Sequence, residues 1–143
     1  MQGKVRPGRG GLIRGETMNY VTLIEMNEPV RLDAGQLGNL YRELGDVGAG
    51  EVICRALDEV AQRLTEAEKH YSGGRFVDLR KTTRSLVGIS RQMGMPKLAR
   101  VACDVVGCID RGDPVALAAT LARLLRIGEG SLTAVWELQG QSL

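Results

Sequence analysis

The chain has 143 residues, of which 43% are hydrophobic and 25% are charged, and its net charge is +2. That length suffices for one domain with a hydrophobic core, and so small a net charge gives no reason in itself to expect binding to nucleic acid or to a membrane surface. Aromatic residues make up only 3% of the chain, so the core has to be built from aliphatic side chains. This composition favours helices packed on helices over a β-sandwich.

Membrane insertion, export and metal binding are not expected from the sequence. No apolar run approaches the roughly 20 residues that span a bilayer, and the basic N-terminus is not followed by the apolar stretch of a secretory signal. The cysteines Cys54, Cys103 and Cys108 fit no common zinc pattern, and we expect them to be buried free thiols in a reducing cytoplasm. His70 is the only histidine, so a histidine-based metal site is not expected. The sequence therefore predicts a cytoplasmic protein without a cofactor.

The N-terminal 31 residues differ in composition from the rest. Residues 1–17 are rich in glycine and arginine without periodicity, which is typical of a flexible tail, or of an extension upstream of a natural start at Met18. Contact of this tail with nucleic acid is an alternative that we do not favour. The following stretch, "YVTLIEMNEPV", is ambiguous between a short strand and a packing helix that Pro29 closes. We therefore divide the chain into an N-terminal region, 1–31, and a helical bundle, 32–143.

The bundle begins with two helices separated by a glycine. Asp33 can cap a short helix that ends near Gly45, and Asp46 can cap a longer helix that ends at the "SGG" of residues 72–74. His70 falls in the last turn, where a polar or cationic side chain suits the exposed carbonyls. The inner face of the longer helix follows steps of three and four residues: Ile53, Leu57, Val60, Leu64, Ala67 and Tyr71.

Three further helices follow. The first covers about residues 75–93, the second ends at Gly112, and the third is capped by Asp113 with Pro114 at its first position. Gly128 and Gly130 are predicted to bend the last helix. The expected inner positions are Phe76, Leu79, Thr83, Leu86, Ile89 and Met93; Leu98, Val101, Ala102, Val105 and Ile109; and Leu117, Leu121, Leu124, Leu125, Leu132, Val135 and Trp136. Short connections between long helices predict an all-α fold, an up-down antiparallel four-helix bundle with a short extra N-terminal helix.

The stretch "TRSLVGISRQMG", residues 83–94, resembles the motif of histidine-containing phosphotransfer (HPt) domains. That motif reads roughly A-H-x-L-K-G, with another glycine six residues later. Leu86, Gly88 and Gly94 match it in residue type and spacing. The resemblance covers about residues 32–138 and includes the Gly-Asp turn at residues 112–113. It implies the same four-helix bundle that the helix pattern predicts.

The two reactive positions of the motif depart from the family. Arg84 stands in place of the phosphoacceptor histidine, and Val87 stands in place of the lysine three residues later. A guanidinium stays protonated and only donates hydrogen bonds, so Arg84 cannot act as the nucleophile that accepts a phosphoryl group. Val87 removes a cation that would help to neutralise the phosphoryl oxygens. The sequence therefore predicts a domain that is not an enzyme.

The helical spacing places these residues on one outward face. Arg84 shares this face with Arg80 and Arg91, while Leu86 points to the core. An ordinary solvated helix face is the simpler interpretation. The resemblance implies instead that this face docks a receiver domain, whose acidic active site suits a fork of guanidinium donors. The expected partner-binding residues are Arg80, Lys81, Arg84, Val87, Gly88 and Arg91.

Three functions remain open. The leading hypothesis is a non-catalytic HPt-like adaptor or decoy that docks the receiver domain of a response regulator, or a histidine kinase, in a two-component phosphorelay. The second is a structural or dimerisation module outside phosphorelays, since a fold does not fix a function. The third is an active phosphotransfer protein that uses His70 as a displaced acceptor. The sequence does not indicate the oligomeric state.

Overall fold

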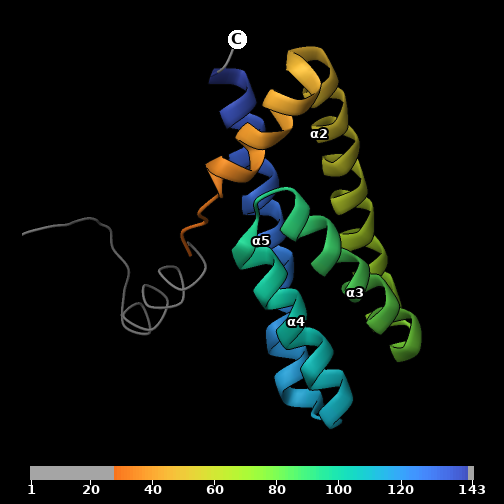
Figure 1. The fold of residues 1–143 in the computed structure, drawn as a ribbon. Coiled ribbons are helices and arrows are strands. Elements are labelled where there is room, and N and C mark those ends of the chain that lie inside the picture. The colour runs from red at the N-terminus through yellow and green to blue at the C-terminus, as the bar shows by residue number, and fades with distance from the viewer. Residues whose placement is uncertain (1–27, 142–143) are drawn as a thin grey trace, which may run out of the picture.

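The computed structural model describes residues 28–141, which form four helices and no strand in that range (Figure 1). They are α2 (Ala34–Ser72), α3 (Phe76–Gln92), α4 (Pro96–Arg111) and α5 (Pro114–Gln141). The prediction of an all-helical fold is confirmed. The expected tail, residues 1–17, and most of the ambiguous segment, up to residue 27, lie outside the described residues. Within residues 28–141, none of the helices has both the length and the apolar character needed to cross a bilayer.

Helix α2 follows the predicted pattern and contains a kink. Asp33 caps it, because its Oδ1 accepts a hydrogen bond from the backbone N–H of Gln36 at 3.2 Å. Gly45 has non-helical backbone angles, φ 74° and ψ 173°, within the single helix Ala34–Ser72. The kink therefore occurs at the residue where the first of two helices was predicted to end. A positive φ is readily adopted by glycine, so the sequence locates the change of direction seen in Figure 1.

The predicted inner face of α2 is confirmed. Five of its six positions are buried and Tyr71 is partly buried; the buried five are Ile53, Leu57, Val60, Leu64 and Ala67. On α3, Leu79, Leu86 and Thr83 are fully buried, and the Thr83 hydroxyl donates to the carbonyl of Leu79 at 2.7 Å. Phe76 was predicted to be inward but is 45% exposed. It lies in the first turn of α3, where its ring meets the edge of Tyr71 at the end of the bundle.

Helices α4 and α5 are joined by the predicted turn. Gly112 adopts the left-handed conformation with φ 63°, and Asp113 caps α5 through its Oδ1, which accepts from the N–H of Ala116 at 3.1 Å. Gly128 and Gly130 do not interrupt the last helix, because α5 is helical without a break from Pro114 to Gln141. Tertiary packing overrides the low helix propensity of glycine there.

Gly128 allows α5 to approach α2 closely. It is buried, and a Cβ at this position would lie 2.5 Å from Leu64 Cδ1. The absence of a side chain at Gly128 thus allows α5 to pack closely against Leu64 of α2. Further along α5, Val135 is buried as predicted, but Trp136 is 65% exposed, so the prediction that this tryptophan packs in the core is wrong. Its indole instead lines surface hollows between α2 and α5.

Each helix packs against two others. Helix α3 contacts α2 and α4, and α5 contacts α4 and α2, so the four surround one core. The segment before α2 is held by Glu28, whose carboxylate pairs with Lys97 of α4 at 3.0 Å and with Arg123 of α5. These hydrogen bonds, chiefly that from Arg123, lower the pKa of Glu28 to about 2, although partial burial opposes the shift.

The cysteines differ from the prediction. Cys108 is buried, whereas Cys54 and Cys103 are exposed on α2 and α4. A free cysteine is small and only weakly polar, so its chemistry does not fix whether it lies in the core or at the surface. The packing of neighbouring helices determines its exposure.

Candidate functional site

The outward face of α3 carries the expected register. Leu86 is fully buried, while Arg84, Gly88 and Arg91 are exposed and Val87 is partly buried. Leu86 therefore faces the core, while the residues two positions before and after it face outward, as a helix with 3.6 residues per turn requires. Gly88 has no atom within 4 Å of the position that a Cβ would occupy. The space above it is open, so this glycine is not required by packing within the described structure.

A shallow groove lies between α3 and α4 beside Arg84. Its lining combines two arginines with small apolar side chains: Arg84, Val87, Gly88, Arg91, Cys103 and Val106. The structure thus brings together four of the six predicted partner-binding residues. Arg91 reaches over the groove toward α4, with its Nη2 4.0 Å from the Cys103 sulfur. A partner that enters this groove would meet two guanidinium groups and the apolar side chains of Val87 and Val106.

Arg80 is held by an ion pair next to the groove. Its Nε donates to Asp110 Oδ1 at 2.7 Å and its Nη2 donates to Oδ2 at 3.1 Å, a bidentate contact from α3 to α4. The Arg80 guanidinium lowers the pKa of the Asp110 carboxyl, chiefly by hydrogen bonding, and the charges of Arg84 and Arg111 lower it further, while desolvation opposes them. Arg80 therefore serves mainly to join two helices.

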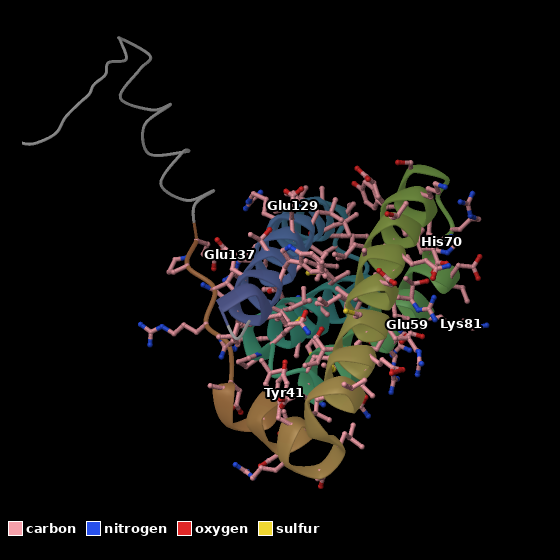
Figure 2. All side chains as sticks on the ribbon, turned by 90° about the horizontal axis from the view of Figure 1, so that it is seen from above. Tyr41, Glu59, His70, Lys81, Glu129 and Glu137 are labelled. Atoms are coloured by element: carbon pink, nitrogen blue, oxygen red, sulfur yellow. The ribbon has the colours of Figure 1, made fainter. Side chains whose placement is uncertain are left out.

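Arg84 differs from Arg80 in its bonding. Within residues 28–141 its side chain has no hydrogen bond or ion pair, although it lies near enough to Asp110 to stabilise that charge. Its donors thus face solvent at the mouth of the groove. Lys81 is exposed on the outer side of α3 and does not line the groove (Figure 2). Two of the expected residues, Arg80 and Lys81, consequently flank the groove without lining it.

His70 lies elsewhere. It is in the last turn of α2, as predicted, and its Nδ1 accepts a hydrogen bond from Arg75 Nε at 3.3 Å. Figure 2 shows it on the outside of the bundle, near the end of α2. Among the described residues no group of three or more acidic, histidine or cysteine side chains could hold a metal ion.

Sequence reasoning missed the α4 half of the groove. Cys103, Val106 and Asp110 follow each other at steps of three and four, which places them on one face of α4. This spacing is visible in the sequence. Only the pairing of α3 with α4, however, shows that this face adjoins Arg84 rather than solvent.

The groove offers charged donors and apolar surface for binding a partner. Arginine forks recognise carboxylates and phosphates in a bidentate manner, and the valines add apolar contact area.

No family model, no curated protein and no solved structure matches this chain.

Proposed function

We propose that the chain is a non-catalytic HPt-like signalling domain that docks a receiver domain, or a histidine kinase, as an adaptor or decoy in a cytoplasmic two-component phosphorelay. In this proposal the four helices form an up-down antiparallel bundle, and the part of α2 before Gly45 is the short extra N-terminal helix. The residues of the motif, Leu86, Gly88 and Gly94, supply the resemblance on which the family assignment rests.

One observation carries the proposal: Arg84, at the acceptor position of the motif, lines a groove together with Arg91 and with the apolar side chains of Val87 and Val106. A receiver presents a cluster of carboxylates around its phosphorylatable aspartate, as the resemblance implies. The guanidinium of Arg84 would meet these carboxylates while Val87 and Val106 contact their apolar surroundings. Charge complementarity of this kind directs a partner to one orientation.

Binding to receiver domains tests the proposal. Wild-type protein is immobilised, and receivers from the same cell are passed over it by surface plasmon resonance at two salt concentrations. We expect Arg84→Ala to weaken binding by about 2 kcal/mol or more, chiefly through faster dissociation, because it removes a central charged anchor. Arg84→Lys restores binding only in part, since an ammonium lacks the planar fork.

Matched arginine variants give the control. Arg91→Ala should cost less and act more on the association rate, with an effect that salt screens. Arg55→Ala, on the exposed side of α2, should leave binding unchanged. If no receiver binds, or if Arg84→Ala binds as tightly as wild type, the docking proposal is wrong.

Phosphate transfer is the second test. The protein is incubated with a receiver that carries labelled phosphate, and the label is followed into this chain. We expect none, because Arg84 lacks a nucleophilic nitrogen and His70 lies outside the groove. Label on His70 would instead support an active phosphotransfer protein with a displaced acceptor.

A further inference from the structure

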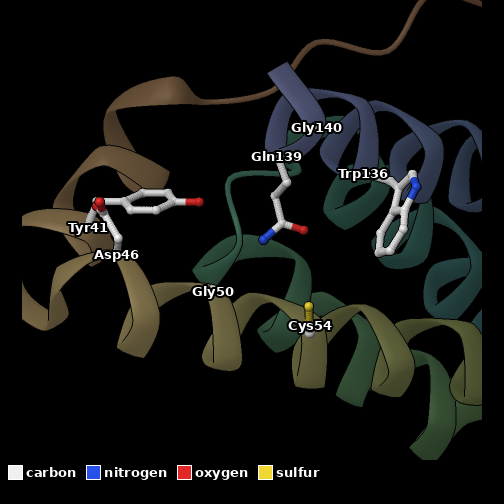
Figure 3. Close-up of a pocket in the computed structure, with 7 residues that line it drawn as sticks. All are labelled: Tyr41, Asp46, Gly50, Cys54, Trp136, Gln139 and Gly140. Carbon is white, nitrogen blue, oxygen red and sulfur yellow. The ribbon is translucent and has the colours of Figure 1, made fainter. Parts of the chain in front are cut away.

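A second groove lies between α2 and α5, on a face that the proposed docking site does not use. It consists of two adjoining hollows, and Cys54 and Trp136 line both of them. Figure 3 shows Tyr41 at one end of the first hollow, Trp136 at the other, and Gln139 and Cys54 between them. From Gly50 to Ala61 the groove follows twelve residues of α2, whose eleven steps span about 16 Å.

The groove exposes a large aromatic side chain. Trp136, the only tryptophan of the chain, is 65% exposed, and Leu57 and Leu132 also line the groove. Aromatic side chains bury 150–250 Å² when they are covered, so covering Trp136 would contribute substantially to binding. An occupant with apolar side chains therefore fits this surface.

The charges around the groove restrict the occupant further. No lysine, arginine or histidine is among the described residues that line either hollow, and each hollow has one aspartate, Asp46 or Asp58. The indole of Trp136 and the ring of Tyr41 also attract cations through their π faces. The groove thus favours an occupant that is both cationic and partly apolar.

We propose that residues 4–14 of this same chain, "KVRPGRGGLIR", dock in the α2–α5 groove. The segment has four cationic residues and no acidic residue, and Val5, Leu12 and Ile13 supply apolar side chains. Its charge of +4 is opposite in sign to that of the two aspartates that line the groove, Asp46 and Asp58. Asp46, Asp58 and the rings of Tyr41 and Trp136 offer partners for the guanidinium groups of this segment, and the exposed indole of Trp136 offers apolar surface for its aliphatic side chains.

The length of the chain permits this contact. Glu28 is held near Arg123 of α5, and Trp136 lies thirteen residues, about 20 Å, further along the same helix. The fourteen residue steps from Arg14 to Glu28 span at most roughly 45 Å when extended. Tethering gives the segment a local concentration on the order of millimolar, so even weak affinity for the groove is sufficient. A partner in solution lacks this advantage.

Trp136 reports on the groove directly, because it is the only tryptophan. The test compares full-length wild type with a full-length variant in which Lys4, Arg6, Arg9 and Arg14 are changed to glutamine. We expect the variant to emit at longer wavelength and to be quenched more strongly by acrylamide, since its indole is uncovered. Raising the salt concentration should move wild type toward the variant and leave the variant unchanged. Equal emission and quenching of the two proteins at low salt would overturn the proposal.

Further variants test whether the change in the tryptophan signal arises at the groove. Asp46→Asn combined with Asp58→Asn should expose Trp136 to the same extent, and adding it to the glutamine variant should have no further effect. Far-UV circular dichroism and the urea midpoint confirm that each variant is folded. Arg84→Ala should leave the tryptophan signal unchanged, so failure of receiver docking does not affect this result.

The protein concentration decides which chain supplies the segment. A signal that is independent of dilution, in a protein that sediments as a monomer, supports docking within one chain. If the wild-type signal is lost on dilution together with a dimer, the segment of a second copy occupies the groove, and the intramolecular proposal is wrong.

Discussion

Truncation of Leu86 to alanine tests the register of α3 on which the functional assignment depends. Leu86 is fully buried, whereas Gly88, two residues further along the helix, is exposed. Removing three carbon groups costs about 2.4 kcal/mol of transfer free energy at roughly 0.8 kcal/mol each. The cavity that remains adds a further cost, so the expected loss of unfolding free energy is about 3–5 kcal/mol. This is a large part of the 5–15 kcal/mol that is typical of one domain.

Arg84→Ala provides the matched comparison, because Arg84 is two residues away on the same helix and exposed. Its loss should change the unfolding free energy by no more than about 0.5 kcal/mol. Urea unfolding measured by circular dichroism separates the two. With a slope of about 1.5 kcal/mol/M, Leu86→Ala lowers the midpoint by roughly 2 M or more and Arg84→Ala barely moves it. Equal shifts of the two midpoints would refute the assigned register, and with it the place of Arg84 at the groove.

Three further predictions concern stability. Gly128→Ala should lower the free energy of unfolding by about 1–2 kcal/mol in urea unfolding, since the new Cβ collides with buried Leu64 and this outweighs the gain in helix propensity. Gly88→Ala, where the space is open, should raise the free energy of unfolding by about 0.5–1 kcal/mol. Gly94→Ala should cost about 2 kcal/mol or more, because Gly94 has φ 69° and a Cβ would lie 2.7 Å from the backbone oxygen of Asp33; a midpoint equal to wild type would contradict the close approach of these two segments. Glu28→Gln should cost about 1–2 kcal/mol at neutral pH. Since folding lowers the pKa of Glu28 from 4.5 to about 2, its stabilisation is complete above pH 4.5 and is lost as the pH falls toward 2, so wild type and Glu28→Gln should converge in acid unfolding curves.

Much of the fold is determined by local sequence. Asp33 and Asp113 cap helices because a carboxylate at that position accepts from free backbone N–H groups, whatever lies around it. Gly45 and Gly112 have positive φ, a conformation that glycine adopts without steric cost. The period of 3.6 residues likewise separates buried Leu86 from its exposed neighbours.

The candidate site was predicted only in part. The sequence identifies the α3 side of the groove, because Arg84, Val87, Gly88 and Arg91 share one helix face. It does not reveal that Asp110, thirty residues from Arg80, neutralises that arginine. The periodicity of a helix shows which of its own residues share a face. It does not show which face of the next helix packs opposite.

Tertiary packing alone decided the remaining features. Phe76 and Trp136 occupy positions that their apolar character assigns to the core, yet both are exposed. Phe76 lies in the first turn of α3, and Trp136 lies next to buried Val135 with its indole in the groove between α2 and α5. Gly128, which local propensity marks as a bend, is instead the contact that brings α5 against Leu64 of α2. The sequence by itself thus determined which residues form helices and which face of most turns is apolar, since these depend on atoms a few residues apart. The depth of each side chain, the groove and the bidentate pair depend on where the other helices lie, and only the tertiary structure sets those positions.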